Sequence, residues 1–235
     1  MTFLLFDNEV ININFILIHK DPTATMMEAM NNKVRLVSYL KVRQAIGVLA
    51  ISMPIVLVLN SWYCGTAIKP SISHYYYTNM GDVFVGLLFG MAMFLFTYKG
   101  YEKKDDFITN AASIAALCIA IFPTSYHVGQ PCAECAELSI LRNYHGMIHN
   151  ISAAVFFSLL AIYTFWFFPK SEKVGPRQKS RNTLYKICGV GMIISLLVVV
   201  LMTRADQSIF WPESTLMILF GIAWIVKGNM FFAAK

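Results

Sequence analysis

Charged residues are scarce in this chain: Asp, Glu, Lys and Arg make up 14% of its 235 residues, whereas hydrophobic residues make up 57%. A soluble globular domain carries about a quarter charged residues. A chain this apolar has too little polar surface to cover itself in water, which excludes a soluble enzyme, a nucleic-acid-binding module and a disordered protein. The five cysteines are too few for a disulfide scaffold.

Six apolar stretches have the length and polarity needed to cross a hydrocarbon core of roughly 30 Å. Because a backbone in lipid must satisfy its own hydrogen bonds, each stretch is expected to be a helix. Little chain remains between them, so we expect an all-α polytopic membrane protein, with one six-helix transmembrane bundle over residues 44–230. The predicted spans are residues 44–62, 81–98, 107–123, 144–168, 184–203 and 209–228.

Lysine and arginine are distributed very unevenly between the two sides of this predicted bundle. If the N-terminus is inside, 16 of the 19 Lys and Arg residues lie on the inner side, and only Lys69, Arg142 and Arg204 lie outside. Cytoplasmic loops carry the excess of these residues. We therefore expect both termini to be cytoplasmic and the protein to be a multi-pass protein of a bacterial inner membrane.

Residues 1–43 precede the first predicted span and are harder to interpret. Residues 3–18 mix apolar side chains with Asp and Asn, so they are too polar to span a membrane. They do not form a signal peptide either, because no basic region precedes an apolar core that ends in small residues. Two interpretations stay open: a cytoplasmic leader that lies at the membrane interface, or a non-essential extension upstream of a later start at residues 26–30.

The predicted spans carry no ionisable residue near their midplanes, where transporters and pumps usually place such groups. Polar residues gather instead at the outer ends of the spans. These residues are Ser73, His74, Asp82, His145, His149, Arg204 and Glu213. We expect a single outward-facing pocket lined by Asp82, His149 and Glu213, with the tyrosines of residues 75–77 on its rim.

His145 and His149 stand four residues apart, so they lie on the same face of one predicted helix. Zinc sites on helices use this spacing. His74 is the third histidine expected nearby, and with it the three residues predict a metal site, with zinc as the cofactor. The alternative interpretation is that the histidines lie at the wet interface and bond to loops.

Ser73, Asp82 and Glu213 are the other candidate catalytic residues, and each has a structural alternative. Ser73 and Asp82 are expected either to orient a bound water or, for Asp82, to cap its helix. Glu213 follows Pro212 at the start of a predicted helix, where the helix dipole favours a carboxylate. Glu213 is otherwise expected to pair with Arg204 or with a histidine across the pocket.

Cys132 and Cys135 form a CxxC motif in an outer loop, and Cys64 lies on the same side. In an oxidising compartment we expect Cys132 to form a disulfide, most simply with Cys135 and otherwise with Cys64. A redox pair or half of a metal site are the alternatives.

Gly86 and Gly90 form a GxxxG motif within one predicted span. Such a motif allows a neighbouring helix to approach closely. It predicts close packing inside the bundle or, between subunits, a homo-oligomer that forms through this face.

Several segments together resemble a family of six-helix bacterial membrane proteins to which no activity is assigned. The matching segments are Ser38-Tyr39-Leu40, Arg43-Gln44-Ala45-Ile46-Gly47, Ser71-Ile72-Ser73, Tyr75-Tyr76, Asp82-Val83-Phe84-Val85-Gly86, Phe96-Thr97-Tyr98-Lys99-Gly100-Tyr101, Phe122-Pro123-Thr124, His149 with Ser152-Ala153-Ala154, Phe210-Trp211 with Glu213, and Trp224 to Gly228. The resemblance covers about residues 31–230 and includes Ser73, Asp82, His149 and Glu213. His74, His145 and the CxxC motif fall outside the family's pattern.

A fainter similarity links the chain to the alkaline ceramidase and progestin-receptor-like membrane hydrolases. Their seven helices hold a zinc ion with histidines, beside a serine and an aspartate. The residues that correspond in order are Ser71 or Ser73, His74, Asp82, His145 and His149. This similarity implies a membrane-embedded hydrolase, here with one helix fewer.

Two functions are therefore open as hypotheses. The first is metal-assisted hydrolysis of a lipid-like ester or amide by a zinc-bound water, with His74, His145 and His149 as ligands, Asp82 as base and Ser73 as oxyanion stabiliser. The second is a non-enzymatic protein that binds or passes a small molecule or lipid headgroup at its outer face. In either case membrane lipids are the expected surroundings, and no nucleic acid is expected as a partner.

Overall fold

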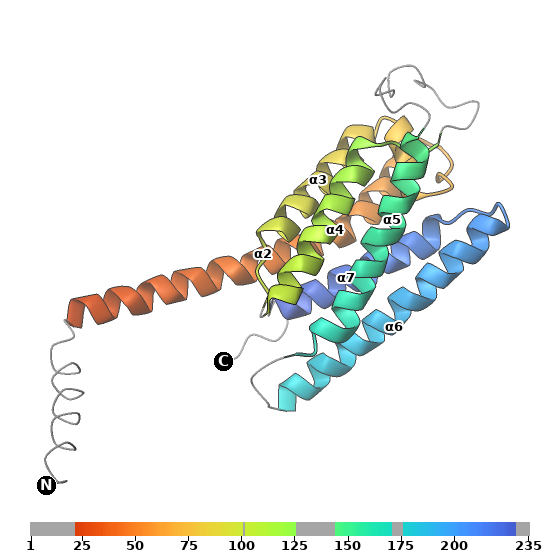
Figure 1. The fold of residues 1–235 in the computed structure, drawn as a ribbon. Helices are drawn as coiled ribbons and strands as arrows, with labels where there is room; N and C mark the ends of the chain where they lie inside the picture. Colours follow the sequence, from red (N-terminus) through yellow and green to blue (C-terminus); the bar gives the residue numbers. More distant parts are fainter. Residues whose placement is uncertain (1–21, 101, 126–143, 171–175, 229–235) are drawn as a thin grey trace, which may run out of the picture. The chain divides into compact units, whose positions relative to one another are not determined.

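A computed structural model describes residues 22–100, 102–125, 144–170 and 176–228, and the regular structure of these residues is entirely helical (Figure 1). The chain divides into two compact units, Met1–Tyr39 and Leu40–Lys235. The described residues of the first unit belong to helix α2, and the helix bundle lies in the second unit.

A helix covers each of the six stretches predicted as spans. The elements in order are α2 (Pro22–Tyr63), the short 3-10 helix η1 (Ile72–Tyr77), α3 (Gly81–Thr97), α4 (Lys103–Ile121), α5 (His145–Ile162), the π-helical turn η4 (Tyr163–Phe167), α6 (Pro176–Arg204) and α7 (Phe210–Lys227). Helix α2 begins at Pro22, well before the predicted boundary at residue 44, so the described end of the leader is helical.

Among the described residues, four helical stretches are long and apolar enough to cross a membrane. These are Tyr39–Tyr63, His145–Phe167, Gln178–Arg204 and Phe210–Lys227. Helix α3 is apolar but shorter, and α4 begins with a charged run, Lys103 to Asp106. For the described residues, a helical fold with helices able to span a membrane is therefore confirmed.

Helices α3, α4 and α5 pack side by side, and α6 packs against α7 (Figure 1). Helix α4 fits between its neighbours because the side chains that it buries are small. Ala112, Ala116 and Ala120 are buried, and the Ser113 hydroxyl donates a hydrogen bond of 2.8 Å to the Ala92 carbonyl of α3. Small residues and hydroxyl bonds of this kind are how helices associate in lipid.

Helices α2 and α7 approach each other closely at Gly47 and Gly221. A Cβ atom on Gly47 would lie 2.7 Å from the Gly221 carbonyl oxygen, and one on Gly221 would lie 2.7 Å from the Gly47 carbonyl oxygen. Gly86 of the predicted GxxxG motif has open space around its missing Cβ. Gly86 lies on an exposed side of α3, whereas a Cβ on Gly90 would lie 3.6 Å from the Leu49 side chain of α2. Among the described residues, only the Gly90 half of the motif therefore faces another helix.

The loops segregate to two ends of the bundle. At one end, named here the Ser73 end, the Ile209 amide donates to the Pro70 carbonyl (2.7 Å) and the Tyr77 hydroxyl donates to the Thr124 carbonyl (2.6 Å). These bonds join the predicted outer loops to one another. The segments predicted to be cytoplasmic lie together at the opposite end, named here the Arg43 end.

A buried polar cluster holds the Arg43 end together. The Arg43 guanidinium, which is buried, donates to the Lys227 carbonyl (3.3 Å) and to the Tyr98 hydroxyl (3.1 Å). The Lys227 ammonium in turn donates to the Phe168 carbonyl (2.7 Å). Trp224 is fully buried beside this cluster, with its ring centroid 4.9 Å from that of Tyr98. The sequence alone did not single out this cluster.

Candidate functional site

The short helix η1 brings Ser73 to the bundle, and two tyrosines anchor it there. The Tyr75 hydroxyl shares a hydrogen bond of 2.6 Å with the Ser61 hydroxyl of α2, and Tyr77 bonds to the Thr124 carbonyl (2.6 Å). Both tyrosines are buried, and neither lines the cavity beside Ser73, so their predicted position on the rim of the pocket is not observed. Their hydroxyl groups have partners inside the protein, which is what allows their rings to be buried.

Tyr76 differs from the other two tyrosines, because it is only half-buried. Partial burial raises the pKa of its hydroxyl above the ordinary value of 10.0. Tyr76 is therefore neutral at physiological pH and contributes no charge to this end of the bundle.

His149, in the first turns of α5, connects two other segments of the chain. Its side chain is only 2% exposed. Its Nδ1 lies 2.8 Å from the Phe122 carbonyl oxygen, and its Nε2 lies 2.9 Å from the Ser73 hydroxyl oxygen. Ser73 and His149 are 76 residues apart in sequence, so this contact results from the tertiary fold.

These two bonds determine which ring nitrogen of His149 carries the proton. A carbonyl oxygen only accepts hydrogen bonds, so Nδ1 must be the donor to Phe122. In the neutral ring Nε2 is then the acceptor, and the Ser73 hydroxyl donates to it. Serine thus faces the basic nitrogen of a histidine whose ring is oriented by a backbone carbonyl.

Glu213 reaches the same region from the first turn of α7, as its sequence position predicted. It is 7% exposed, and its Oε2 accepts a hydrogen bond of 2.8 Å from the Ile72 backbone amide. The alternative pairing with Arg204 is wrong, because Arg204 lies exposed at the end of α6 and Glu213 bonds to η1 instead.

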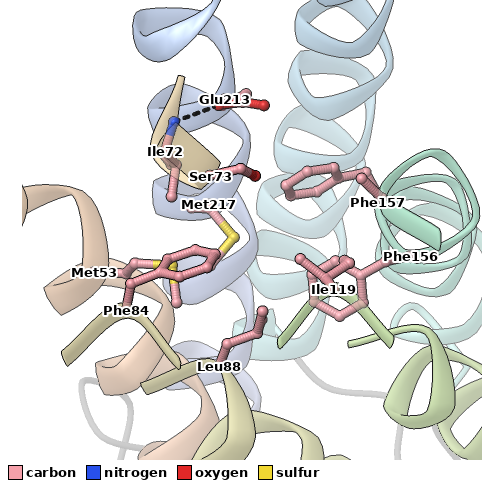
Figure 2. A pocket seen from close by; sticks show the side chains of 11 residues that line it. Met53, Ile72, Ser73, Phe84, Leu88, Ile119, Phe156, Phe157, Glu213 and Met217 are labelled. Atoms are coloured by element: carbon pink, nitrogen blue, oxygen red, sulfur yellow. Dashed lines mark hydrogen bonds between the residues drawn. The ribbon is translucent and has the colours of Figure 1, made fainter. Parts of the chain in front are cut away.

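A small cavity lies between these elements, and Figure 2 shows the Ser73 hydroxyl and the Glu213 carboxylate on one part of its wall. The rest of the wall is apolar, and includes Phe84, Leu88 and Phe156 (Figure 2). The cavity has a volume of about 20 Å³. This volume admits one water-sized molecule.

His149 does not line this cavity and meets it only through its bond to the Ser73 hydroxyl. Asp82 does not belong to the cavity either, so of the predicted lining residues Asp82, His149 and Glu213 only Glu213 lies on the wall. The Asp82 side chain is exposed in the first turn of α3. The structural alternative, that Asp82 caps this helix, is not observed either, because the N-cap residue of α3 is Met80. A carboxylate in the first turn is still stabilised by the helix dipole.

The three predicted zinc ligands do not assemble into a metal site. His74 Nδ1 lies 2.6 Å from the Ser71 hydroxyl, and His145 Nδ1 donates to the Pro123 carbonyl (3.2 Å). In the part of the chain that the structure describes, no group of three or more His, Cys, Asp or Glu side chains is arranged to hold a metal ion. The hypothesis of a zinc cofactor therefore gains no support.

The cysteine prediction stays largely untested. Cys132 and Cys135 lie outside the described residues. Cys64 is exposed and forms no disulfide with another cysteine that the structure describes.

No family model, curated protein or solved structure matches this chain. Both resemblances from the sequence therefore stay predictions, and a proposal about function depends on the geometry of the site. Sequence inspection missed the Phe122 carbonyl, because any residue supplies one, and it missed the apolar wall, because lipid-facing and cavity-facing residues look alike in sequence.

Proposed function

We propose that this chain is a six-span protein of the bacterial inner membrane, with both termini cytoplasmic. Its Ser73 end then faces outward and binds a small polar group of a lipid-like ligand. The observation that carries the proposal is the position of Ser73 of η1 and Glu213 of α7 on the wall of one small cavity, with His149 of α5 bonded to the Ser73 hydroxyl.

The exposed tryptophans support the membrane placement. Trp62 and Trp211 are exposed near the Ser73 end, whereas Trp166 is exposed near the other end. Tryptophan is enriched at both membrane interfaces. Between these levels, apolar side chains such as Ile187 and Leu201 are exposed on the bundle surface, as expected of a lipid-facing surface.

Reporter fusions test the proposed topology. A fusion after Lys235 is expected to be active only with a cytoplasmic reporter, and a fusion after Gln130 only with a periplasmic one, because of the basic residues on the inner side. A periplasmic C-terminus would contradict the proposal that the Ser73 cavity faces outward.

The chemistry of the cavity suits a hydroxyl or amide group on an otherwise apolar ligand. The Glu213 carboxylate and the Ser73 hydroxyl offer hydrogen bonds, and the remaining wall offers only hydrocarbon and thioether surface. Sites of this kind bind through apolar contact and gain specificity from a few polar groups. Since the cavity now holds only about 20 Å³, the surrounding side chains must part to admit more than the polar group.

The Ser73–His149 pair favours a second candidate function, hydrolysis of a lipid-like ester or amide without a metal. A serine within 2.9 Å of the acceptor nitrogen of an oriented histidine has the geometry of an activated nucleophile. The Ser73 oxygen would attack the carbonyl carbon while its proton passes to His149 Nε2. The protonated ring would give that proton to the departing alcohol or amine, and a water molecule would then cleave the acyl-serine ester to release the fatty acid.

One experiment separates the two candidates. The purified protein in lipid nanodiscs is incubated with a monoacylglycerol and with an N-acylethanolamine. Native mass spectrometry measures retained ligand, and chromatography measures released fatty acid. The binding function predicts retention without release, and about tenfold weaker retention in Glu213→Gln and Ser73→Ala, since each loses a hydrogen bond to the ligand.

Asp82→Asn is the matched control, because Asp82 is an exposed acidic residue at the same end but outside the cavity. It is expected to retain ligand as the unchanged protein does. Fatty acid release that disappears in both Ser73→Ala and His149→Gln would establish hydrolysis instead. Equal retention by all of these variants would contradict both functions.

A further inference from the structure

A second hollow lies on the surface of the bundle, at the end opposite Ser73. It has a volume of about 330 Å³ and is lined by Lys103, Lys104, Phe107 and Ile108 of α4 and by Phe167 of η4. Its size is within the range of ligand sites, about 300–1,000 Å³. It opens on the outside of the bundle, where Phe107 is 73% exposed.

The spacing of these residues on α4 arranges charge above apolar surface. Lys103 and Phe107 are four residues apart, as are Lys104 and Ile108, so each lysine lies one turn above an apolar side chain on the same face. Long lysine side chains place their ammonium groups toward water while their stems cover apolar surface. The hollow therefore has a basic rim and an apolar floor.

The carboxylates near this rim are engaged with other groups. Glu102 pairs with Lys170 (3.6 Å), and Asp106 pairs with Lys99 (3.8 Å). Neither Lys103 nor Lys104 forms an ion pair with a residue that the structure describes. The two lysines are exposed, so their charges are available to an anion from outside the chain.

We propose that this hollow binds one anionic phospholipid, whose phosphate lies between Lys103 and Lys104 and whose acyl chain lies against Phe107, Ile108 and Phe167. Two features of the hollow complement such a lipid. The two lysine charges face the phosphate, and the apolar floor faces the acyl chain. Basic pockets at the cytoplasmic ends of helices bind acidic headgroups in this way. The inference rests on the membrane placement proposed above, but it does not depend on the Ser73 cavity.

Native mass spectrometry of the full chain tests this proposal, with phosphatidylglycerol and phosphatidylcholine of the same acyl chains as probes. The unchanged protein is expected to retain phosphatidylglycerol selectively. Lys103→Gln/Lys104→Gln is expected to bind it about thirtyfold more weakly, because each lysine near the headgroup contributes about fivefold. Phe107→Ala is expected to weaken retention of phosphatidylglycerol as well, because part of the floor is lost.

The matched control is Lys179→Gln/Lys186→Gln, which removes the same charge from exposed positions on α6. It is expected to keep the affinity, and Lys103→Arg/Lys104→Arg is expected to keep most of it. Equal losses in the two glutamine pairs, or no preference for phosphatidylglycerol, would overturn the proposal. If the reporter fusions still give the proposed topology, only the lipid site has failed; if they do not, the proposed function has failed with it.

Discussion

Gly221→Leu is expected to destabilise the bundle far more than the same substitution at Gly86. A side chain at Gly221 would point at the Gly47 carbonyl oxygen and at Ile51, with a Cβ only 2.7 Å and 2.5 Å from their nearest atoms. The backbone oxygen cannot turn aside as a flexible side chain can, so α2 and α7 must move apart. Overpacking costs about 3 kcal/mol or more in such a case.

The measurement is the melting temperature of the purified protein in detergent, which is expected to fall by roughly 6–12 °C. Gly86→Leu is the matched control, because it adds the same side chain to another apolar helix where nothing lies within 4 Å. It is expected to melt within about 2 °C of the unchanged protein. If both variants melted alike, the crossing of α2 and α7 would not be a close backbone contact.

The positions of the helices could be predicted from sequence because lipid imposes one simple demand on a long apolar segment. The start of α2 could not. The residues from Pro22 to Arg43 are polar enough to argue against a membrane span, but a polar segment can still be helical. The hydropathy of a segment indicates its surroundings, and it does not show where a helix begins.

Half of the candidate site could be predicted in the same way. Ser73, His149 and Glu213 were expected at one level of the membrane. The fold places Ser73 and Glu213 on the wall of one cavity and bonds His149 to the Ser73 hydroxyl. Asp82 was expected at the same level but lies exposed on α3. Sequence position determines the depth of a residue in the bundle, whereas the rotation of each helix about its axis determines whether the residue faces the interior.

Arg43, at the opposite end of the bundle, is a second residue whose burial the sequence does not predict. In the sequence it is one of many basic residues that flank a span, and such residues usually lie in water. Its side chain is instead buried against Tyr98 and the Lys227 carbonyl. The sequence shows an excess of positive charge on the side predicted to be cytoplasmic, but it does not distinguish a buried arginine from its exposed neighbours.

Arg43→Ala is accordingly expected to destabilise the bundle by about 3 kcal/mol, because hydrogen bonds from a buried charged donor contribute roughly 1.5–3 kcal/mol each. The loss separates α2 from α3 and α7 at once, since Arg43 bonds to Tyr98 at the end of α3 and to Lys227 of α7. The melting temperature in detergent is expected to fall by roughly 6–12 °C.

Two further variants identify the cause of that loss. Lys41→Ala removes a positive charge two residues earlier on α2, where the side chain is exposed, and it is expected to change the melting temperature by less than about 2 °C. Arg43→Lys keeps the charge but loses the planar fork that reaches two acceptors, so it is expected to lie between Arg43→Ala and the unchanged protein. A lysine variant as stable as the unchanged protein would show that charge alone suffices at this position. An alanine variant no less stable than Lys41→Ala would show that the buried hydrogen bonds of Arg43 do not hold α2, α3 and α7 together.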